Sequence, residues 1–349
     1  MKKLISVFVS AVFMTSLLLT LTSCGDDRQK LYILSYGDYI GTGVIDEFEK
    51  AYPQYRVIYD DTAETPEAMY QKLKSGVPYD VLVCSDYIVE KMINENLLNE
   101  LDKSKLKNYQ YISEDLRGGL YDPEGKYTVP YMWGTVGIIY NKKLVSDNVD
   151  SWNLLWNTKY KGQIQILDSV RDSMGMALKY SGFSINSTNE SEINKARDAL
   201  IAQKSTMDPV VGVDSIKQAM VAGQYAFTVT YSGDALMMIE QNPDLAYVVP
   251  KEGSNVWVDA MIMPNTGKNN EGAYAYIDFM CSTDIATKNV EYIKYSTPHT
   301  QALANVSDEL RNNPAFNPSA DVIARCEYYD DLGSAIDLYN AAWEAFRMA

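Results

Sequence analysis

The stretch Tyr79-Asp80-Val81-Leu82-Val83-Cys84-Ser85-Asp86-Tyr87 decides the fold of this chain. Its first five residues have the apolar and β-branched character of a buried strand, and Ser85 stands where a helix N-cap is expected. Val89, Met92 and Ile93 then recur at helical spacing, so that one face of the following helix is apolar. A buried strand that continues directly into a capped helix is the repeating unit of a parallel α/β sheet.

Two units of the same kind precede this one. Residues 31–35 and 55–59 are predicted strands, and apolar side chains at helical spacing predict a helix over residues 44–52. The next helix is predicted to begin with Thr65 as its N-cap and Pro66 in its first position. This alternation indicates a parallel, doubly wound sheet, whose ligands bind beyond the carboxyl ends of its strands.

The remaining chain is long enough for a second lobe with a core of its own. Two extended segments, residues 127–133 and 136–140, are separated by Gly134 and could carry the chain between the lobes. A further helix is predicted from Met174 onward. We therefore predict a two-lobed α/β fold, with mixed sheets flanked by helices and a ligand in the hinge cleft. The predicted lobes are residues 31–137 with 259–303, and residues 138–258 with 304–349.

The N-terminus has the pattern of a secretory lipoprotein signal. Two lysines are followed by an apolar run over residues 4–21, and then by Leu21-Thr22-Ser23-Cys24, which resembles a bacterial lipobox. We predict a signal peptide over residues 1–23, a lipid on Cys24 and a polar tether over residues 24–30. The protein would then be extracytoplasmic and held at a membrane. An ordinary signal peptide with a chance cysteine is the alternative.

Composition excludes several classes of function. The formal net charge of −15 at pH 7 argues against nucleic acid and favours cationic ligands. Cys84, Cys281 and Cys326 fit no metal-binding spacing, so buried free thiols are expected. His299 is the single histidine of the chain, and it is expected in a loop. No metal and no other cofactor is predicted, and a histidine-dependent hydrolase is disfavoured.

Aromatic and acidic residues gather at four predicted strand ends. The sharpest example is Val256-Trp257-Val258-Asp259, because residues i and i+2 of a strand point to the same face. An aromatic face beside a carboxylate is a receptor for an organic cation. The other three groups are Tyr36 with Asp38 and Tyr39, Ser169 with Asp172, and Tyr231 with Asp234.

Several motifs together resemble the bacterial polyamine-binding proteins that deliver spermidine or putrescine to ABC transporters. The resemblance covers nearly the whole mature chain and implies a periplasmic-binding-protein-like fold with permease subunits as partners. It rests on residues 31–39, 79–87, 129–134, 151–156 and 160–162, and most specifically on Pro250-Lys251-Glu252-Gly253, Trp257-Val258-Asp259 and residues 268–273.

The resemblance also implies roles for single residues. Trp257 and Tyr231 would stack on the methylene chain of the polyamine, and Asp259 would pair with an ammonium or the central amine. Tyr36 and Tyr39 would form the opposite wall of the site, with Asp38 beside them. Ser85 and Tyr87 would hydrogen-bond to one terminal amine of the ligand. Asp172 would bind the other end, and Tyr295 would line the site.

Four positions leave the length of the ligand open. The family usually has Trp where Tyr36 and Tyr231 stand, and spermidine binders have an acid at Ser169 and a Gln at the position aligned with Tyr329. The run from Tyr231 to Asp234 is instead similar to putrescine-preferring members. The sequence therefore predicts putrescine, spermidine or both.

Other functions have weaker support in the sequence. An amino-acid ligand would need a cation for its carboxylate, and Arg171 is the one candidate at a strand end. Ferric iron would use phenolates such as Tyr328 and Tyr329, and a sugar remains an alternative ligand. A glycosidase could use paired carboxylates, but no nucleophile with a base is evident, so no enzyme is predicted. A purely structural lipoprotein would not need four such clusters.

Overall fold

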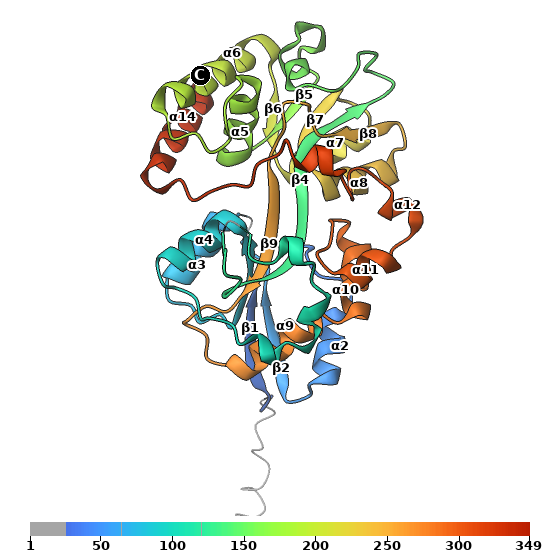
Figure 1. The fold of residues 1–349 in the computed structure, drawn as a ribbon. Coiled ribbons are helices and arrows are strands. Elements are labelled where there is room, and N and C mark those ends of the chain that lie inside the picture. Colours follow the sequence, from blue (N-terminus) through green and yellow to red (C-terminus); the bar gives the residue numbers. More distant parts are fainter. Residues whose placement is uncertain (1–25, 64, 120) are drawn as a thin grey trace, which may run out of the picture.

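The computed structural model describes residues 26–349 except 64 and 120. The predicted signal peptide and Cys24 therefore lie outside the described residues. Two groups of strands and helices are stacked end to end and joined by two long strands, β4 (Val129–Asn141) and β9 (Val256–Ile262) (Figure 1). This is the two-lobed α/β architecture that the sequence predicts.

The three N-terminal units form as expected. The structure contains β1 (Gln29–Leu34), α2 (Val44–Ala51), β2 (Tyr55–Asp60), α3 (Pro66–Lys74), β3 (Val81–Ser85) and α4 (Asp86–Asn94). β1 lies between β2 and β3 and is parallel to both. Thr65 accepts the Ala68 amide with its side chain, as a helix N-cap does. Strand β1 starts at Gln29 and so includes the last two residues of the predicted tether.

One strand carries the chain between the halves. The two extended segments predicted on either side of Gly134 are the single strand β4, with a register shift between Pro130 and Met132. Its first part, from Val129 to Thr135, pairs with β9, and its last part pairs with β7 (Phe227–Tyr231) and β8 (Leu245–Val248). Gly134 does not break the strand. Because it has no side chain, it leaves space for the ring of Trp257.

Within the described residues, nine strands form one hydrogen-bonded sheet in the order β2-β1-β3-β9-β4-β7-β5-β6, with β8 paired to β4. The upper half of Figure 1 contains β5 (Ile164–Leu167), β6 (Val210–Gly212), α7 (Lys217–Val221) and α8 (Ser232–Gln241). Helices α5 (Val170–Tyr180), α6 (Glu190–Met207) and α14 (Ile336–Met348) pack together on the opposite side of that sheet from α7 and α8.

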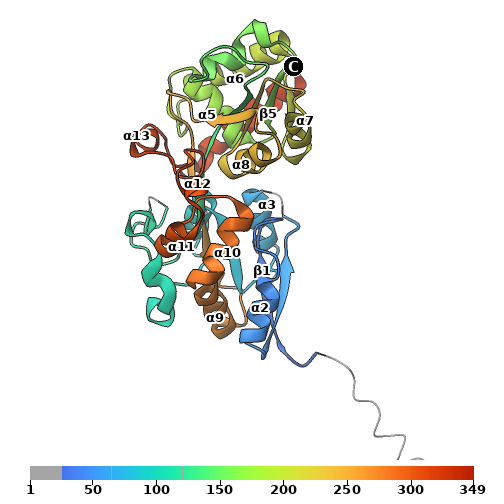
Figure 2. The ribbon, with the colours of Figure 1, turned by 90° about the vertical axis from the view of Figure 1, so that its right-hand side faces the viewer.

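The lower half also has helices on both faces of its sheet. Helices α3 and α4 cover one face, and α2, α9 (Asn270–Met280) and α10 (Thr283–Ile293) cover the other (Figures 1 and 2). Short helices α11 (Thr300–Asn305), α12 (Asp308–Arg311) and α13 (Ala320–Ile323) return the chain to the upper half. Nowhere in the described ranges is a helix both long and apolar enough to span a membrane.

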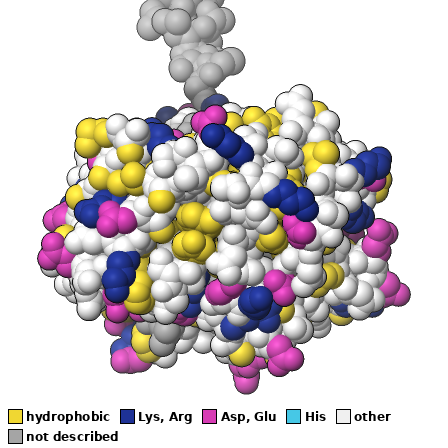
Figure 3. Space-filling view, turned by 90° about the horizontal axis from the view of Figure 1, so that it is seen from above, with side chains coloured by type: hydrophobic (Ala, Val, Ile, Leu, Met, Phe, Trp, Pro, Cys, Tyr) yellow, Lys and Arg dark blue, Asp and Glu magenta, His cyan; other side chains and the backbone are white. Residues whose placement is uncertain are grey.

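The upper face of the molecule carries charges of both signs. Lys and Arg side chains lie among Asp and Glu side chains there, with hydrophobic side chains between them (Figure 3). The acidic excess of the chain is therefore not concentrated on this face.

Two helix starts differ from their prediction, and both bear on the site. Helix α5 begins at Val170, one turn before the predicted Met174, because Ser169 caps it by accepting the Asp172 amide at 3.3 Å. Ser85 occupies the N-cap position of α4, but its side chain makes no capping bond. The prediction that the Ser85 side chain caps this helix was wrong, because its hydroxyl is used elsewhere.

The histidine and two of the three cysteines behave as expected, whereas Cys326 is only partly buried. Cys84, Cys281 and Cys326 are free thiols, and the first two are buried. His299 lies in the connection before α11, where its Nδ1 accepts the Ala302 amide and its Nε2 faces the Cys281 carbonyl at 2.9 Å. Both ring nitrogens therefore have structural roles.

Candidate functional site: two carboxylate clusters and an aromatic wall

Asp259 is the centre of the first cluster. It lies on β9 directly opposite Ser85 at the carboxyl end of β3, because β9 runs antiparallel to β3. The Ser85 hydroxyl donates to Asp259 Oδ1 at 2.5 Å, and the Tyr39 hydroxyl donates to Oδ2 at 2.6 Å. The Tyr36 hydroxyl lies 3.1 Å from Ser85 Oγ and extends the network. Four residues predicted for the site from the sequence are thus in one hydrogen-bonded group.

Burial changes the acidity of this group. Asp259 is only 4% exposed, and removal from water raises its pKa to about 6, while hydrogen bonds from Ser85 and Tyr39 act in the opposite direction. Burial also raises the pKa of Tyr36 and Tyr39, so both phenols stay neutral donors. The cluster is therefore an anion with neutral donors at its oxygens and no ion-pair partner within the described residues.

Aromatic rings continue from Asp259 toward the upper half. Trp257 packs edge to face against Tyr295, with ring centroids 4.9 Å apart, and against Tyr231 at 6.3 Å. Tyr295 in turn lies 6.0 Å from Tyr39, whose ring is 5.4 Å from that of Tyr36. These five rings come from four separate segments of the chain and form a continuous aromatic wall. The indole Nε1 of Trp257 is buried without a hydrogen-bond partner.

Two glycines allow this wall to pack closely. A Cβ at Gly134 would lie 2.7 Å from the Trp257 ring, and a Cβ at Gly233 would lie 2.4 Å from the Tyr295 ring. Real Cβ atoms do not approach that closely, so any larger residue would displace the rings. The glycine that looked like a separator between two strands is thus a contact surface for Trp257.

Asp172 is the centre of a second cluster, in the first turn of α5. Hydroxyls of Ser169 and Tyr231 donate to its Oδ2 at 2.7 Å each, and the Tyr329 hydroxyl donates to Oδ1 at 3.1 Å. Asp172 is 7% exposed and, like Asp259, has no ion-pair partner within the described ranges. The N-terminus of α5 supplies a favourable partial positive charge to the carboxylate.

Tyr87 stands beside the second cluster but points its hydroxyl elsewhere. That hydroxyl donates to Glu67 Oε1 at 2.7 Å, while the ring lies 5.8 Å from Tyr329. The Arg171 guanidinium lies over both rings, 5.2 Å from Tyr87 and 4.2 Å from Tyr329. It also donates to the Asp330 carbonyl and to Asn186. Tyr87 and Arg171 therefore contact each other from α4 and α5, one helix of each half.

Two predicted acids lie apart from these clusters. Asp234 is partly buried and forms an ion pair with Lys217 at 2.8 Å. Burial raises the pKa of Asp234, and Lys217 opposes that effect. Asp38 is exposed on the turn after β1, in a left-handed conformation with φ of 53°. The structure thus does not bring Asp38 or a free Asp234 carboxylate against the aromatic wall.

Several residues around the site carried no useful pattern in the sequence. Tyr131 donates to the Tyr39 carbonyl at 2.9 Å and packs on its ring, so it fixes the position of Tyr39. Asp86 is fully buried, and both its oxygens accept backbone amides, from Tyr87 and Val258. Burial raises the pKa of Asp86 to about 8. The contacts of Tyr131 with Tyr39 and of Asp86 with Val258 join segments far apart in sequence, so no local pattern reveals them.

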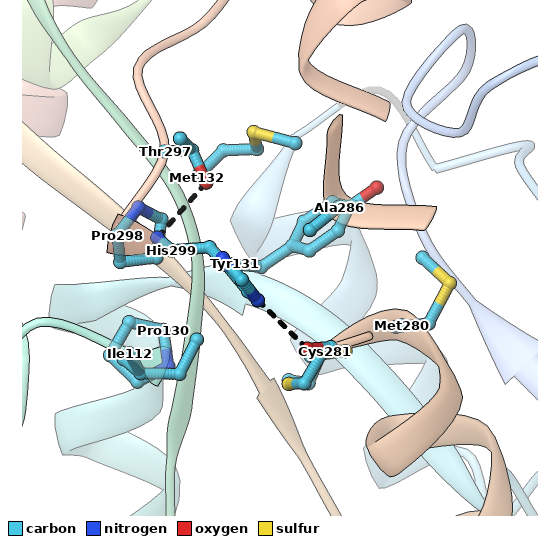
Figure 4. Close-up of a pocket in the computed structure, with 11 residues that line it drawn as sticks. Ile112, Pro130, Tyr131, Met132, Met280, Cys281, Ala286, Thr297, Pro298 and His299 are labelled. Atoms are coloured by element: carbon cyan, nitrogen blue, oxygen red, sulfur yellow. Dashed lines mark hydrogen bonds between the residues drawn. The ribbon is translucent and has the colours of Figure 1, made fainter. Parts of the chain in front are cut away.

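A small pocket is lined in part by Tyr131, the residue that packs on Tyr39 (Figure 4). Tyr131, Pro130, Met280 and His299 are among its lining residues, and the His299 ring is bonded to the Cys281 carbonyl. Its lining contains no carboxylate, so it does not share the chemistry of the two acidic clusters. No group of three or more His, Cys, Asp or Glu side chains suited to a metal occurs within the described residues.

The chain belongs to the family described as bacterial extracellular solute-binding protein, which matches residues 43–318. This is a family of solute-binding proteins and not of enzymes. Among its curated relatives, the spermidine/putrescine-binding periplasmic protein of Escherichia coli K12 is 33% identical over 327 residues, which cover 92% of each chain.

Solved structures agree with this placement. A putative spermidine/putrescine ABC transporter protein from Listeria monocytogenes is 40% identical, with a TM-score of 0.87 over 92% of this chain and 99% of that one. The Tp0655 (TpPotD) lipoprotein of Treponema pallidum is 27% identical, with a TM-score of 0.82 over 92% of this chain and all of that one.

Proposed function

We propose that this protein captures polyamines, putrescine or spermidine, outside the cytoplasm and delivers them to the permease of an ABC transporter. The observation that carries the proposal is the pair of buried carboxylates, Asp259 and Asp172, at either end of one aromatic wall. Neither has a cationic side chain as its partner within the described residues. A flexible chain with an ammonium at each end would supply both missing charges.

The energies suffice for useful affinity. Each charge-assisted hydrogen bond contributes roughly 1.5–3 kcal/mol, and each aromatic–cation contact contributes roughly 0.5–2 kcal/mol. A few of each offset the cost of ordering and desolvation and leave about −8 kcal/mol, which is micromolar binding. Trp257, Tyr231 and Tyr295 would contact the methylene groups, while Ser85, Tyr39 and Tyr36 would hold Asp259 in place.

Charge argues against an amino-acid ligand. Its carboxylate would need a free cation, but Arg171 is already engaged by the Asp330 carbonyl, Asn186 and two tyrosine rings. The chain has no other arginine in these clusters. A sugar would not require two unpaired carboxylates. Ferric iron would require phenolates, but burial raises the pKa of Tyr231 and Tyr329, whose hydroxyls surround Asp172, so both phenols stay neutral.

The cellular setting is part of the same proposal. The lipobox around Cys24 would attach the protein to a membrane by a lipid, which fits a relative that is itself described as a lipoprotein. Residues 31–137 with 259–303 and residues 138–258 with 304–349 would act as two lobes that close on the ligand. Each lobe would present part of its surface to a permease subunit.

Isothermal titration calorimetry of the mature protein tests the ligand class. Putrescine, cadaverine, spermidine and spermine form one set, and amino acids, sugars and ferric iron form the other. We expect micromolar or tighter binding of at least one polyamine, and none of the second set. Trp257→Ala should weaken that binding at least tenfold without unfolding the protein. Binding of an amino acid or sugar in place of every polyamine would overturn the proposal.

A further inference from the structure

Lys217 forms an ion pair with Asp234, the third acid predicted for the site. Its ammonium lies between two carboxylates, 2.8 Å from Asp234 and 2.7 Å from Asp214. Asp214 is largely exposed, whereas the Asp234 side chain is 13% exposed and that of Lys217 is 26% exposed. The pair of Lys217 with Asp234 is therefore the inner one, where screening by solvent is weak.

Asp234 would otherwise belong to the aromatic wall. It lies in the first turn of α8, immediately after Gly233, whose backbone packs against the Tyr295 ring. Because Gly233 lies against the Tyr295 ring, the next residue, Asp234, is placed beside that ring too. Burial raises the pKa of the Tyr295 hydroxyl, and the charge of Asp234 acts in the same direction. Tyr295 in turn packs on Trp257. Asp234 thus stands one ring away from Trp257.

We propose that Lys217 determines how many positive charges the ligand carries, by taking the place that a third ammonium would occupy on Asp234. With Asp234 neutralised, the cleft offers two unpaired carboxylates, Asp259 and Asp172, which match a diamine. A triamine would have to place its additional ammonium near the Lys217 ammonium, and like charges repel. This inference rests on the proposed polyamine function and gives it a preference for two charges over three.

The first test changes the charge of Lys217. Lys217→Met should raise the ratio of spermidine affinity to putrescine affinity at least tenfold in calorimetry of the mature protein. Lys217→Arg keeps the charge and should leave the ratio within about twofold of the parent. Asp214→Asn removes only the exposed partner of Lys217 and should do the same. An unchanged ratio in Lys217→Met would overturn the proposal.

The second test does not depend on the folding of a variant with an unpaired buried acid. The double variant Lys217→Met with Asp234→Asn removes the whole ion pair and leaves no net charge behind. It should bind putrescine within about twofold of the parent, and it should lack the gain for spermidine seen in Lys217→Met. A tenfold loss of putrescine affinity would show that Asp234 holds the ligand directly, which contradicts the inference.

The parent protein separates this inference from the proposed function. If the parent binds no polyamine, the proposed function fails before any variant is measured. If it binds polyamines and the variants behave like the parent, only the role of Lys217 fails. Thermal unfolding of each variant, without ligand, confirms that the compared proteins are folded.

Discussion

Asp259 and Asp172 are both buried carboxylates held by hydroxyl groups, but the fold builds them differently. Asp259 lies in the middle of the sheet, and its two donors, Tyr39 and Ser85, come from segments 220 and 174 residues away. Asp172 lies in the first turn of a helix, and one of its three donors, Ser169, caps that same helix. The first carboxylate depends on strand register, and the second depends partly on local helix structure.

This difference predicts separate roles for Asp259 and Asp172. Burial in the sheet raises the pKa of Asp259, so the protein alone does not fully stabilise the negative charge of this carboxylate. The N-terminus of α5 and the hydroxyl of Ser169 already stabilise the carboxylate of Asp172. We therefore expect Asp259 to contribute more to binding of an ammonium, and Asp172 to contribute more to the stability of its own surroundings.

The largest effect is expected from Asp259→Asn. Loss of a charge-assisted hydrogen bond of roughly 1.5–3 kcal/mol should weaken polyamine binding about ten- to hundredfold. Calorimetry measures this, with Asp115→Asn as a control that removes the same charge from an exposed position. Equal affinities in the two variants would show that Asp259 does not pair with the ligand.

Acidification should weaken binding through the same group. Burial raises the folded-state pKa of Asp259 from 3.8 to about 6, so the ligand-free protein takes up a proton on Asp259 as pH falls through about 6. Binding of an ammonium requires the charged form, so affinity should fall by about fivefold from pH 6 to pH 5. The pH dependence of affinity should flatten in Asp259→Asn.

The same shift has the opposite sign for stability without ligand. Between pH 6 and 3.8 the folded state binds more protons at Asp259 than the unfolded state does, so the contribution of this group to stability increases as pH falls. Thermal unfolding of the parent and of Asp259→Asn over this range, in the same buffers, isolates that contribution. A parent protein that gains no stability relative to the variant on acidification would contradict the assigned pKa.

Asp172→Asn should have a smaller effect on binding. An amide keeps one acceptor for the three hydroxyls, and we expect roughly a fivefold loss of affinity, equivalent to about 1 kcal/mol. Titration against the same polyamine as for Asp259→Asn ranks the two carboxylates. A greater loss in Asp172→Asn would reverse the roles given to them here.

The serines give the smallest and most local effect. Ser169→Ala removes a helix cap and should lower the free energy of unfolding by about 0.5–2 kcal/mol. Ser85 occupies an N-cap position but makes no capping bond. Ser85→Ala should therefore lower the free energy of unfolding less than Ser169→Ala does. It should weaken ligand binding more, because Ser85 donates to Asp259. Urea unfolding and calorimetry on both variants check the pair. Equal losses of stability would mean that Ser85 supports its helix after all.

The sequence by itself determined the strand–helix units of the N-terminal half. The lipoprotein signal and the shared face of Trp257 and Asp259 stay predictions. These depend on local periodicity and on the two-residue repeat of a strand, which one segment contains on its own. The same reasoning interpreted β4 as two segments, because Gly134 looks like a break in sequence. In the fold, Gly134 is the space that the Trp257 ring fills.

Only the tertiary structure decided which acids are free. Asp234 and Asp172 both follow a strand and lie in the first turn of a helix, and the local difference is the capping Ser169 beside Asp172. The sheet and its connections place Lys217 against Asp234, and the hydroxyls of Tyr231 and Tyr329 against Asp172. Charge pairing between distant segments depends on strand order and register. This long-range arrangement gives the site two carboxylates that have no cationic partner among the described residues.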